Sequence, residues 1–222
     1  RNARVAVMGA GGTGAPAIQY LAAAGVGRLV IADDDVVDLS NLQRQTIFAT
    51  ADVGRAKVEV AAAAVRALND DVAVTTIARR IDAENAGGLL DGADVVVDGS
   101  DNFATRLAVA DAALAARVPL VAGAVGQFEG QVGLFRGWEP DKPCYRCFVG
   151  SDPARDEASC AEQGVLGALT GVVGSLAALE AVRQITGFGQ DSAGKLLLID
   201  ALSLRFRTLT LPKDPGCPTC AA

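Results

Sequence analysis

A glycine-rich segment near the N-terminus places the strongest constraint on the fold of this chain. Gly9, Gly11 and Gly14 form a GxGxxG pattern between a β-rich run (residues 4–8) and a segment with helical periodicity, and a second β-rich run (residues 28–32) follows. This order predicts a βαβ unit in which the glycines allow a tight turn and the close approach of a phosphate. The chain is therefore expected to open with a nucleotide-binding unit.

The alternation of strands and helices continues along the chain. Helices are expected over residues 55–68, 83–90, 99–117 and 164–186, and strands over residues 72–77, 94–98, 119–123, 195–200 and 204–211. A hairpin is expected around Glu129 and Gly130, with a strand returning over residues 131–136. The pattern predicts an α/β fold, with a doubly wound, mostly parallel, Rossmann-like sheet and a C-terminal antiparallel extension. With 222 residues and no internal repeat, one domain is the simplest reading.

The charge balance excludes two classes of partner. The formal net charge is −6, and no basic stretch is present to bind nucleic acid or an anionic membrane surface. We also see no signal peptide and therefore expect a cytoplasmic protein.

One apolar segment raises the question of a membrane span. Residues 164–182 are nearly all apolar and contain Gly167 and Gly171 at GxxxG spacing. However, Glu180 lies inside the segment and Arg183 follows it directly. We expect a buried core or subunit-interface helix and no membrane association.

Several polar residues are expected at the carboxyl ends of the strands, where open α/β sheets bind ligands. Asp33 ends the second strand, 19 residues after Gly14, and can accept hydrogen bonds from ribose hydroxyls. Arg44 and Lys57 offer two cations that suit a triphosphate, and Asp101 can hold Mg²⁺. The last three residues also have structural alternatives. Arg44 could be a surface arginine, Lys57 a solvated lysine and Asp101 a helix N-cap. The glycine pattern by itself also allows NAD.

The absence of histidine bears on the chemistry. Many dehydrogenases use a histidine or a tyrosine–lysine pair as a proton relay, and this chain offers only Tyr20 and Tyr145. Adenylation of a C-terminal carboxylate needs no general base, because a carboxyl group with a pKa of about 3.5 is already ionised at neutral pH. Positioning and charge neutralisation are then sufficient for catalysis.

Five cysteines divide into two matching pairs and one left over. Cys144 and Cys147, and Cys217 and Cys220, each have CxxC spacing, and four thiolates can close a tetrahedral, structural zinc site. Disulfides or a redox pair are the alternatives. Cys160 precedes the apolar helix and is either a reactive thiol or an inert loop cysteine.

Taken together, these motifs resemble the MoeB/ThiF (HesA/MoeB/ThiF) family of ubiquitin-activating-enzyme-like adenylyltransferases over nearly the whole chain. The motifs are GAGGTG at 9–14, DDD at 33–35, SNLQRQ at 40–45, GRAKVE at 54–59, DGSDN at 98–102, EGQV at 129–132, PCYRC at 143–147, GVLGALTGVVGSLAALEA at 164–181 and GCPTC at 216–220. SNLQRQ together with a downstream lysine, DGSDN and paired CxxC is far more specific than the glycines alone.

The resemblance implies a set of site residues. ATP would be bound by Gly9, Gly11, Gly12, Gly14, Asp33, Ser40, Asn41, Arg44, Lys57, Asp101 and Asn102, with Arg44 and Lys57 on the phosphates and Asp101 as the carboxylate linked to Mg²⁺. Zn²⁺ would be held by Cys144, Cys147, Cys217 and Cys220, and Cys160 matches a cysteine that some branches use for sulfur transfer.

The resemblance also implies partners. Family members form homodimers and activate the Gly-Gly tail of a ubiquitin-like sulfur carrier such as MoaD or ThiS for molybdopterin or thiamine synthesis. We expect residues 1–222 to form one adenylation domain without the family's N-terminal helix, whose arginine completes the partner's ATP site. The sulfur donor is expected to be a separate protein. An NAD-dependent oxidoreductase and a non-catalytic scaffold that binds ATP or a carrier are the alternative functions.

Overall fold

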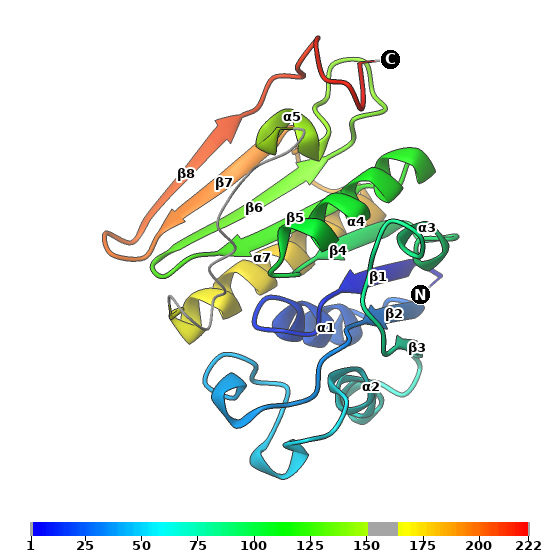
Figure 1. Ribbon diagram of the computed structural model, residues 1–222, viewed down its shortest axis with the longest axis vertical. Helices are drawn as coiled ribbons and strands as arrows, with labels where there is room; N and C mark the ends of the chain where they lie inside the picture. The colour runs from blue at the N-terminus through cyan, green and yellow to red at the C-terminus, as the bar shows by residue number, and fades with distance from the viewer. Residues whose placement is uncertain (1, 151–163, 222) are drawn as a thin grey trace.

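The structure is a computed structural model that describes residues 2–150 and 164–221 and contains an eight-stranded sheet covered by helices on both faces (Figure 1). The strands are β1 (Arg4–Met8), β2 (Arg28–Ala32), β3 (Ala73–Ile77), β4 (Val95–Asp98), β5 (Leu120–Val125), β6 (Glu129–Phe135), β7 (Lys195–Asp200) and β8 (Arg205–Thr210). The helices are α1 (Gly14–Ala23), α2 (Lys57–Leu68), α3 (Ala86–Leu89), α4 (Phe103–Ala116), α5 (Tyr145–Val149) and α7 (Gly167–Thr186), with short 3-10 helices at Leu39–Asn41 and Thr50–Asp52.

The order of the strands confirms the predicted doubly wound sheet. The sequence across the sheet is β3-β2-β1-β4-β5-β6-β7-β8; the first five strands are parallel, and β6, β7 and β8 each pair antiparallel. The chain winds outward from β1 to β3 and then restarts beside β1 with β4. The winding direction thus reverses between β1 and β4, and the loops that follow these two strands open a crevice there.

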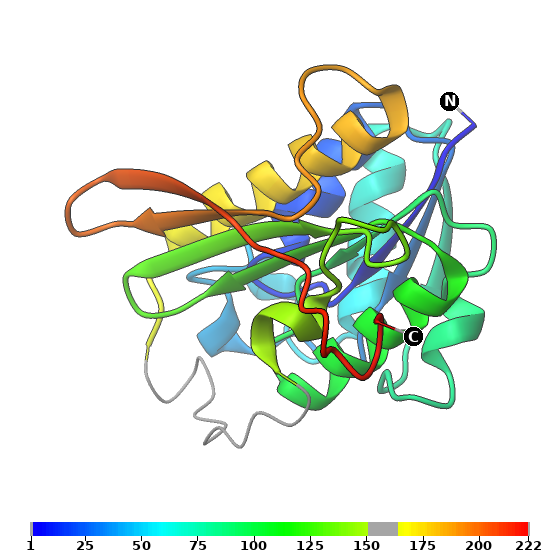
Figure 2. The same cartoon turned by 90° about the horizontal axis from the view of Figure 1, so that it is seen from above.

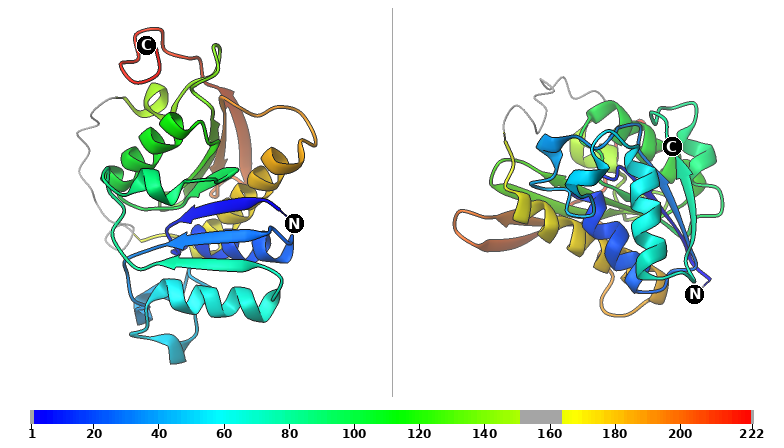
Figure 3. Two further views of the ribbon diagram at one scale, coloured as in Figure 1. Left: turned by 90° about the vertical axis from the view of Figure 1, so that its right-hand side faces the viewer. Right: turned by 90° about the horizontal axis from the view of Figure 1, so that it is seen from below.

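The helices divide between the two faces (Figure 3). Helices α1, α2 and α7 pack on one face, and α3, α4 and α5 pack on the other. Strand β1 shows how the sequence supports both layers: Val5 and Val7 face the first core, and Ala6 and Met8 face the second. All four are fully buried, so β1 reads as a continuous apolar run, as expected of a strand covered on both faces.

The apolar helix α7 is part of the first core. It is the one helix in the described residues that is long and apolar enough to cross a membrane. Its residues Val173, Ala177 and Ala181 are fully buried, and it packs on α1 and on the sheet. The predicted core helix is therefore confirmed for this segment.

The antiparallel extension reaches beyond the helical layers. Figure 2 shows the β7–β8 hairpin extending past the end of α7. Most residues of β8 are exposed, and Leu202 and Leu204 in the hairpin turn are among the most exposed apolar side chains.

The predicted position of the β5–β6 turn was wrong. Glu129 and Gly130 were expected in the turn, but both belong to β6, and Gly126 donates a hydrogen bond to the Glu129 carbonyl across a turn that lies earlier. Gly130 pairs with Val125 and packs under α7, where a Cβ atom would lie 2.7 Å from Val173. Gly130 allows the close approach of α7. From the sequence alone, a glycine needed for close packing cannot be told from a glycine in a hairpin turn.

Candidate functional site

The glycine-rich turn connects β1 to α1 and has two positions that need glycine. Gly9 has a φ of +88°, in the region that side chains rarely occupy. A Cβ atom on Gly14 would lie 1.8 Å from the Gly9 carbonyl oxygen. The chain can therefore turn tightly enough to aim the N-terminus of α1 into the crevice.

A cavity of about 580 Å³ occupies this crevice. It is lined by residues from the ends of four parallel strands: Gly9 after β1, Asp33 after β2, Gly99 after β4, and Val125 at the end of β5. Its position at the carboxyl edge, where the winding reverses, is the expected ligand site of a doubly wound sheet.

Asp33 is fixed by the backbone around it. One carboxylate oxygen accepts a hydrogen bond from the Ala10 amide at 2.7 Å, and the other accepts one from the Asp35 amide at 2.9 Å. Burial raises the pKa of Asp33, and the positive charge of Lys57 offsets part of that rise. Because each oxygen retains a lone pair, the carboxylate can also accept a hydroxyl donor from a ligand.

Two cations border the same cavity. Lys57, the first residue of α2, is 4% exposed, and its ammonium lies 2.7 Å from a carboxylate oxygen of Asp35. Arg44 is half-buried, and its guanidinium donates to the Ser40 carbonyl at 3.2 Å. Both side chains line the cavity, as predicted.

The loop after β4 assigns helix capping and cation binding to different residues, although the sequence allowed both functions for Asp101. The side chain of Asn102 accepts a hydrogen bond from the Thr105 amide at 2.9 Å and caps α4. Asp101 is exposed, lines the cavity and does not occupy the cap position. The alternative of Asp101 as N-cap is therefore set aside, and its carboxylate is available to a cation.

Most of the predicted ATP residues meet at this cavity. Those that line it are Gly9, Gly11, Gly12, Asp33, Arg44, Lys57, Asp101 and Asn102. Gly14 begins α1. Ser40 and Asn41 form part of the first 3-10 helix and are not among the lining residues, so their role as ligands stays a prediction.

Sequence reasoning missed several lining residues. These are Gln45, Arg80, Arg106 and Thr170. Arg106 is 8% exposed although it carries a charge. A lone arginine in the first turns of α4, where the neighbours are apolar apart from Thr105, is a signal that could have identified it.

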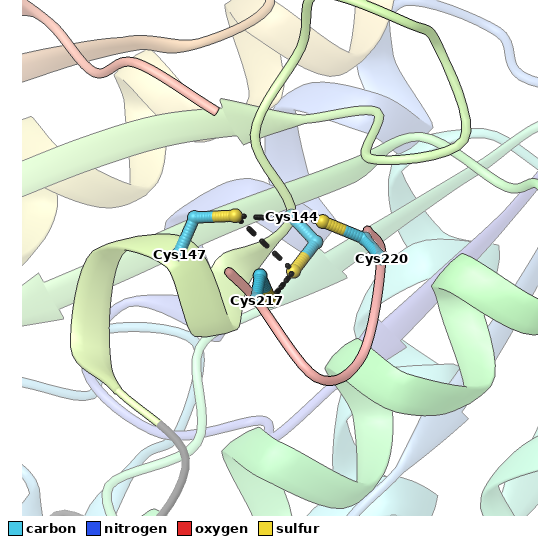
Figure 4. A group of neighbouring side chains, drawn as sticks. All are labelled: Cys144, Cys147, Cys217 and Cys220. Carbon is cyan, nitrogen blue, oxygen red and sulfur yellow. Dashed lines mark hydrogen bonds between the residues drawn. The ribbon is translucent and has the colours of Figure 1, made fainter. Parts of the chain in front are cut away.

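The four paired cysteines form a second site, where the segment after β6 and the start of α5 meet the C-terminal tail (Figure 4). Their sulfurs lie within 4.8 Å of one another, at 3.8 Å for Cys144–Cys147, 3.7 Å for Cys144–Cys217 and 3.4 Å for Cys147–Cys220. A zinc–sulfur bond of about 2.3 Å in tetrahedral geometry separates sulfurs by about 3.8 Å. A disulfide needs about 2.05 Å, so the cluster is compatible with a metal site and not with these disulfides.

The thiols differ in acidity. Burial raises the pKa of Cys144. Burial acts in the same direction on Cys217, but hydrogen bonds from the backbone amides of Thr219 and Cys220 and from the thiols of Cys144 and Cys220 together outweigh it and lower its pKa to about 7. Cys160, the candidate reactive thiol, lies outside the described residues.

Comparison with known proteins places the chain in a family. Residues 1–219 match the model of the ThiF family. The chain is 48% identical to the SAMP-activating enzyme E1 of Haloferax volcanii over 220 residues, which cover 99% of this chain and 80% of that protein. It is 48% identical to the sulfur carrier protein adenylyltransferase of Thermus thermophilus (99% and 83% covered) and 41% identical to the molybdopterin-synthase adenylyltransferase of Escherichia coli (99% and 88% covered).

A solved structure shows the same fold. The crystal structure of E. coli MccB with ATP superposes with a TM-score of 0.87 at 24% identity, covering 100% of this chain and 68% of that one. The family model and the relatives together confirm the resemblance seen in the motifs: the chain belongs to the ThiF family.

Proposed function

We propose that this chain is an adenylyltransferase that uses ATP to activate the C-terminal Gly-Gly carboxylate of a ubiquitin-like sulfur-carrier protein, similar to MoaD or ThiS, for molybdopterin or thiamine synthesis. The names of its relatives support the reaction class, since two of them are adenylyltransferases of a sulfur carrier protein and of molybdopterin synthase. The observation that carries the proposal is that Arg44, Lys57 and Asp101 share one cavity with the glycine turn.

The proposed binding mode follows from the chemistry of the cavity walls. Asp33 accepts hydrogen bonds from the ribose hydroxyls, and the N-terminus of α1 faces the phosphates. Lys57 and Arg44 neutralise the phosphate oxygens. Asp101, whose carboxylate is not used as a helix cap, would hold Mg²⁺, which supplies charge neutralisation for the departing pyrophosphate.

The reaction then depends on alignment. The carrier's terminal carboxylate is ionised at neutral pH and attacks the α-phosphorus, forming the acyl-adenylate as the bond to pyrophosphate breaks. Arg44 and Lys57 stabilise the charge that develops on the pyrophosphate oxygens. No residue has to remove a proton, which agrees with a chain that has no histidine.

We further propose that the four cysteines hold a structural Zn²⁺ ion. All four thiols are available, and their spacing fits a tetrahedral ion. Bound metal would join the C-terminal tail to the segment that follows β6. It takes no part in the adenylation chemistry.

The assembly and its setting are proposed by likeness to the family. We propose that residues 1–222 form one domain that works as a homodimer in the cytoplasm, with a separate protein as the sulfur donor. The relatives support a sulfur-carrier partner, since one is named for acting on such a protein.

A nicotinamide-dependent oxidoreductase is not favoured. Of the two tyrosines, Tyr20 is 59% exposed on α1, and neither it nor Tyr145 lines the cavity. No observation favours the non-catalytic scaffold, since the cavity is lined by Arg44, Lys57 and Asp101, which the reaction needs.

The test is ATP–pyrophosphate exchange with purified carriers that end in Gly-Gly, from the genome that encodes this chain. We expect exchange only when a carrier and Mg²⁺ are both present. Binding of NAD(H) without a need for Mg²⁺ would support the oxidoreductase. ATP binding without exchange for every carrier would support the scaffold.

A further inference from the structure

The start of helix α4 contacts three segments that border the cavity. The hydroxyl of Thr105 donates a hydrogen bond at 3.0 Å to the carbonyl of Ile81, in the loop after β3. The next residue, Arg106, contacts the loop after β4 and strand β5. Asp101, which lines the cavity, lies two residues before the first residue of α4. The first turns of α4 therefore connect the walls around the proposed reaction site.

Arg106 is a buried cation that binds backbone carbonyl groups of two different segments. It is 8% exposed, and its Nη2 atom donates to the carbonyl of Ser100 and, at 2.9 Å, to the carbonyl of Gly123 in β5. Gly123 is paired with Val132 inside the sheet. One nitrogen thus attaches the loop of residues 99–102 to a fixed part of the fold.

The charge of Arg106 is balanced by Asp98, the last residue of β4. Asp98 is 1% exposed, and one of its carboxylate oxygens lies 3.9 Å from the Nη1 atom of Arg106. Because a buried charge is costly without an opposite charge nearby, each residue makes the burial of the other tolerable. The guanidinium therefore uses one terminal nitrogen for the carbonyl groups and faces the carboxylate with the other.

Ser100 is held from two sides by Asp98 and Arg106. Asp98 accepts hydrogen bonds from the Ser100 amide at 3.0 Å and from its hydroxyl at 2.7 Å, while Arg106 donates to the Ser100 carbonyl. This carbonyl belongs to the peptide unit that joins Ser100 to Asp101. Because a peptide unit is planar, fixing its carbonyl oxygen also fixes the direction in which the chain enters Asp101.

We propose that Arg106 is a positioning residue for the adenylation reaction: by holding the Ser100 carbonyl next to β5, it fixes the peptide unit before Asp101 and with it the direction of the Asp101 carboxylate. Arg106 acts through the loop and needs no contact with the substrate. The inference rests on the proposed function for its kinetic consequences, while its structural consequences can be measured on the protein alone.

The test is Arg106→Lys, alone and combined with Asp101→Asn. Lysine keeps a positive charge, but its single nitrogen cannot take the positions of both Nη1 and Nη2. Arg136→Lys is the matched control, because Arg136 forms ion pairs with Glu139 at 2.9 Å and Asp191 at 2.6 Å and is not among the residues that line the cavity. Each protein is measured by thermal unfolding, amide hydrogen exchange and carrier-dependent pyrophosphate exchange.

We expect Arg106→Lys to loosen the loop and to slow the reaction. Amides of residues 99–102 should exchange hydrogen faster, while those of residues 9–14 should not change. The maximal rate of pyrophosphate exchange should fall about tenfold, the loss that one ordinary hydrogen bond gives, with the KM for ATP within about twofold of wild type. Arg136→Lys should match wild type in both exchange measurements.

The double variant separates positioning from a general structural role. If Arg106 acts through the Asp101 carboxylate, Arg106→Lys should slow the reaction by less than about twofold when Asp101→Asn is already present. An equal loss in the two backgrounds would overturn the inference. Unchanged hydrogen exchange at residues 99–102, or an unchanged rate in the single variant, would also overturn it.

Ser100→Ala keeps the inference falsifiable if Arg106→Lys does not fold. It removes only the hydroxyl that donates to Asp98, so the loop is loosened from the other side while Arg106 stays in place. The rate should fall roughly threefold in the wild-type background and remain unchanged in the Asp101→Asn background. An equal fall in both backgrounds would overturn the inference.

The proposed function fails by a different result. If the wild-type protein supports pyrophosphate exchange with no carrier, the adenylation reaction is refuted. Hydrogen exchange, which needs no carrier, would then still decide whether Arg106 holds the loop of residues 99–102.

Discussion

The ammonium of Lys57 lies 2.7 Å from the carboxylate of Asp35, yet the lysine side chain is 5% exposed while that of Asp35 is 65% exposed. A buried cation with a partner that water screens stabilises a fold poorly, because the lysine loses its hydration for a weak attraction. Because Lys57 lies at the cavity wall, its ammonium is placed to form an ion pair with an anionic group of a ligand.

Substituting Lys57→Met tests this role. Methionine fits the buried stem without a charge, so the melting temperature should be unchanged or higher. The Kd for ATP should rise at least ~30-fold, about 2 kcal/mol, because a charge-assisted contact to phosphate is lost. Thermal unfolding and calorimetric titration with ATP check both effects, and unchanged ATP affinity would contradict the assignment.

Asp101 and Asn102 form a matched pair. In Asp101→Asn the helix cap remains, so we expect the wild-type melting temperature and a loss of pyrophosphate exchange of about 100-fold or more. In Asn102→Ala the cap is lost, and the free energy of unfolding should fall by about 1 kcal/mol. Denaturant unfolding and exchange kinetics separate the two effects. An active Asp101→Asn enzyme would show that the carboxylate is not needed for the reaction.

Removal of zinc should release the C-terminal tail. We expect about one zinc per chain in the wild type and little in Cys217→Ser. The free energy of unfolding of the variant should be lower by several kcal/mol, because it lacks the contribution of a structural zinc site. A chelator should lower the melting temperature of the wild type and leave that of the variant unchanged. Equal metal content in the two proteins, or no effect of the chelator on either, would argue against the site.

The acidity of Asp33 predicts a pH dependence. Because burial raises the pKa of Asp33 above its ordinary value of 3.8, the folded protein binds this proton more tightly than the unfolded chain. Ionisation of Asp33 thus lowers stability at neutral pH, and this cost disappears as the pH falls through the raised pKa toward 3.8. Asp33→Asn removes the charge but also one of the two oxygens that accept the Ala10 and Asp35 amides, so the test is the pH dependence. The free energy of unfolding of the wild type, relative to that of the variant, should rise as the pH falls through the raised pKa toward 3.8.

ATP binding should titrate with the same group. The affinity of the wild type should fall on acidification at a higher pH than an ordinary aspartate would give, because the protonated carboxyl loses an acceptor for the ribose. The Asp33→Asn variant should lack this acid limb. Binding measured across the acid range for both proteins checks this; identical profiles would exclude Asp33 as the ribose ligand.

The parts of the fold that follow from local patterns were predicted well. Strands β1, β2 and β7 begin and end at the predicted residues, since each is a short β-rich run with a glycine directly before or after it. Helix α3 is shorter than predicted. The carboxylate of Asp82 accepts hydrogen bonds from the amides of Glu84 and Asn85 and forms a turn where a helix was expected.

The site was predictable where residues follow parallel strands. The glycine turn, Asp33 and Asp101 come directly after β1, β2 and β4, and parallel strands bring their carboxyl ends together. The position of Arg106 depends on its hydrogen bond to the Gly123 carbonyl of β5, a long-range contact that a single sequence does not reveal. The choice between Asp101 and Asn102 as N-cap likewise depended on where α4 begins.

Transfer of AMP to a carrier's terminal carboxylate is the central step of the proposed function, and the mass of the intact carrier measures it directly. With ATP, Mg²⁺ and this protein, a Gly-Gly-ended carrier should gain the mass of one AMP, and the same carrier without its last glycine should gain none. A carrier that never gains this mass, or that gains it equally without the terminal glycine, would contradict the account.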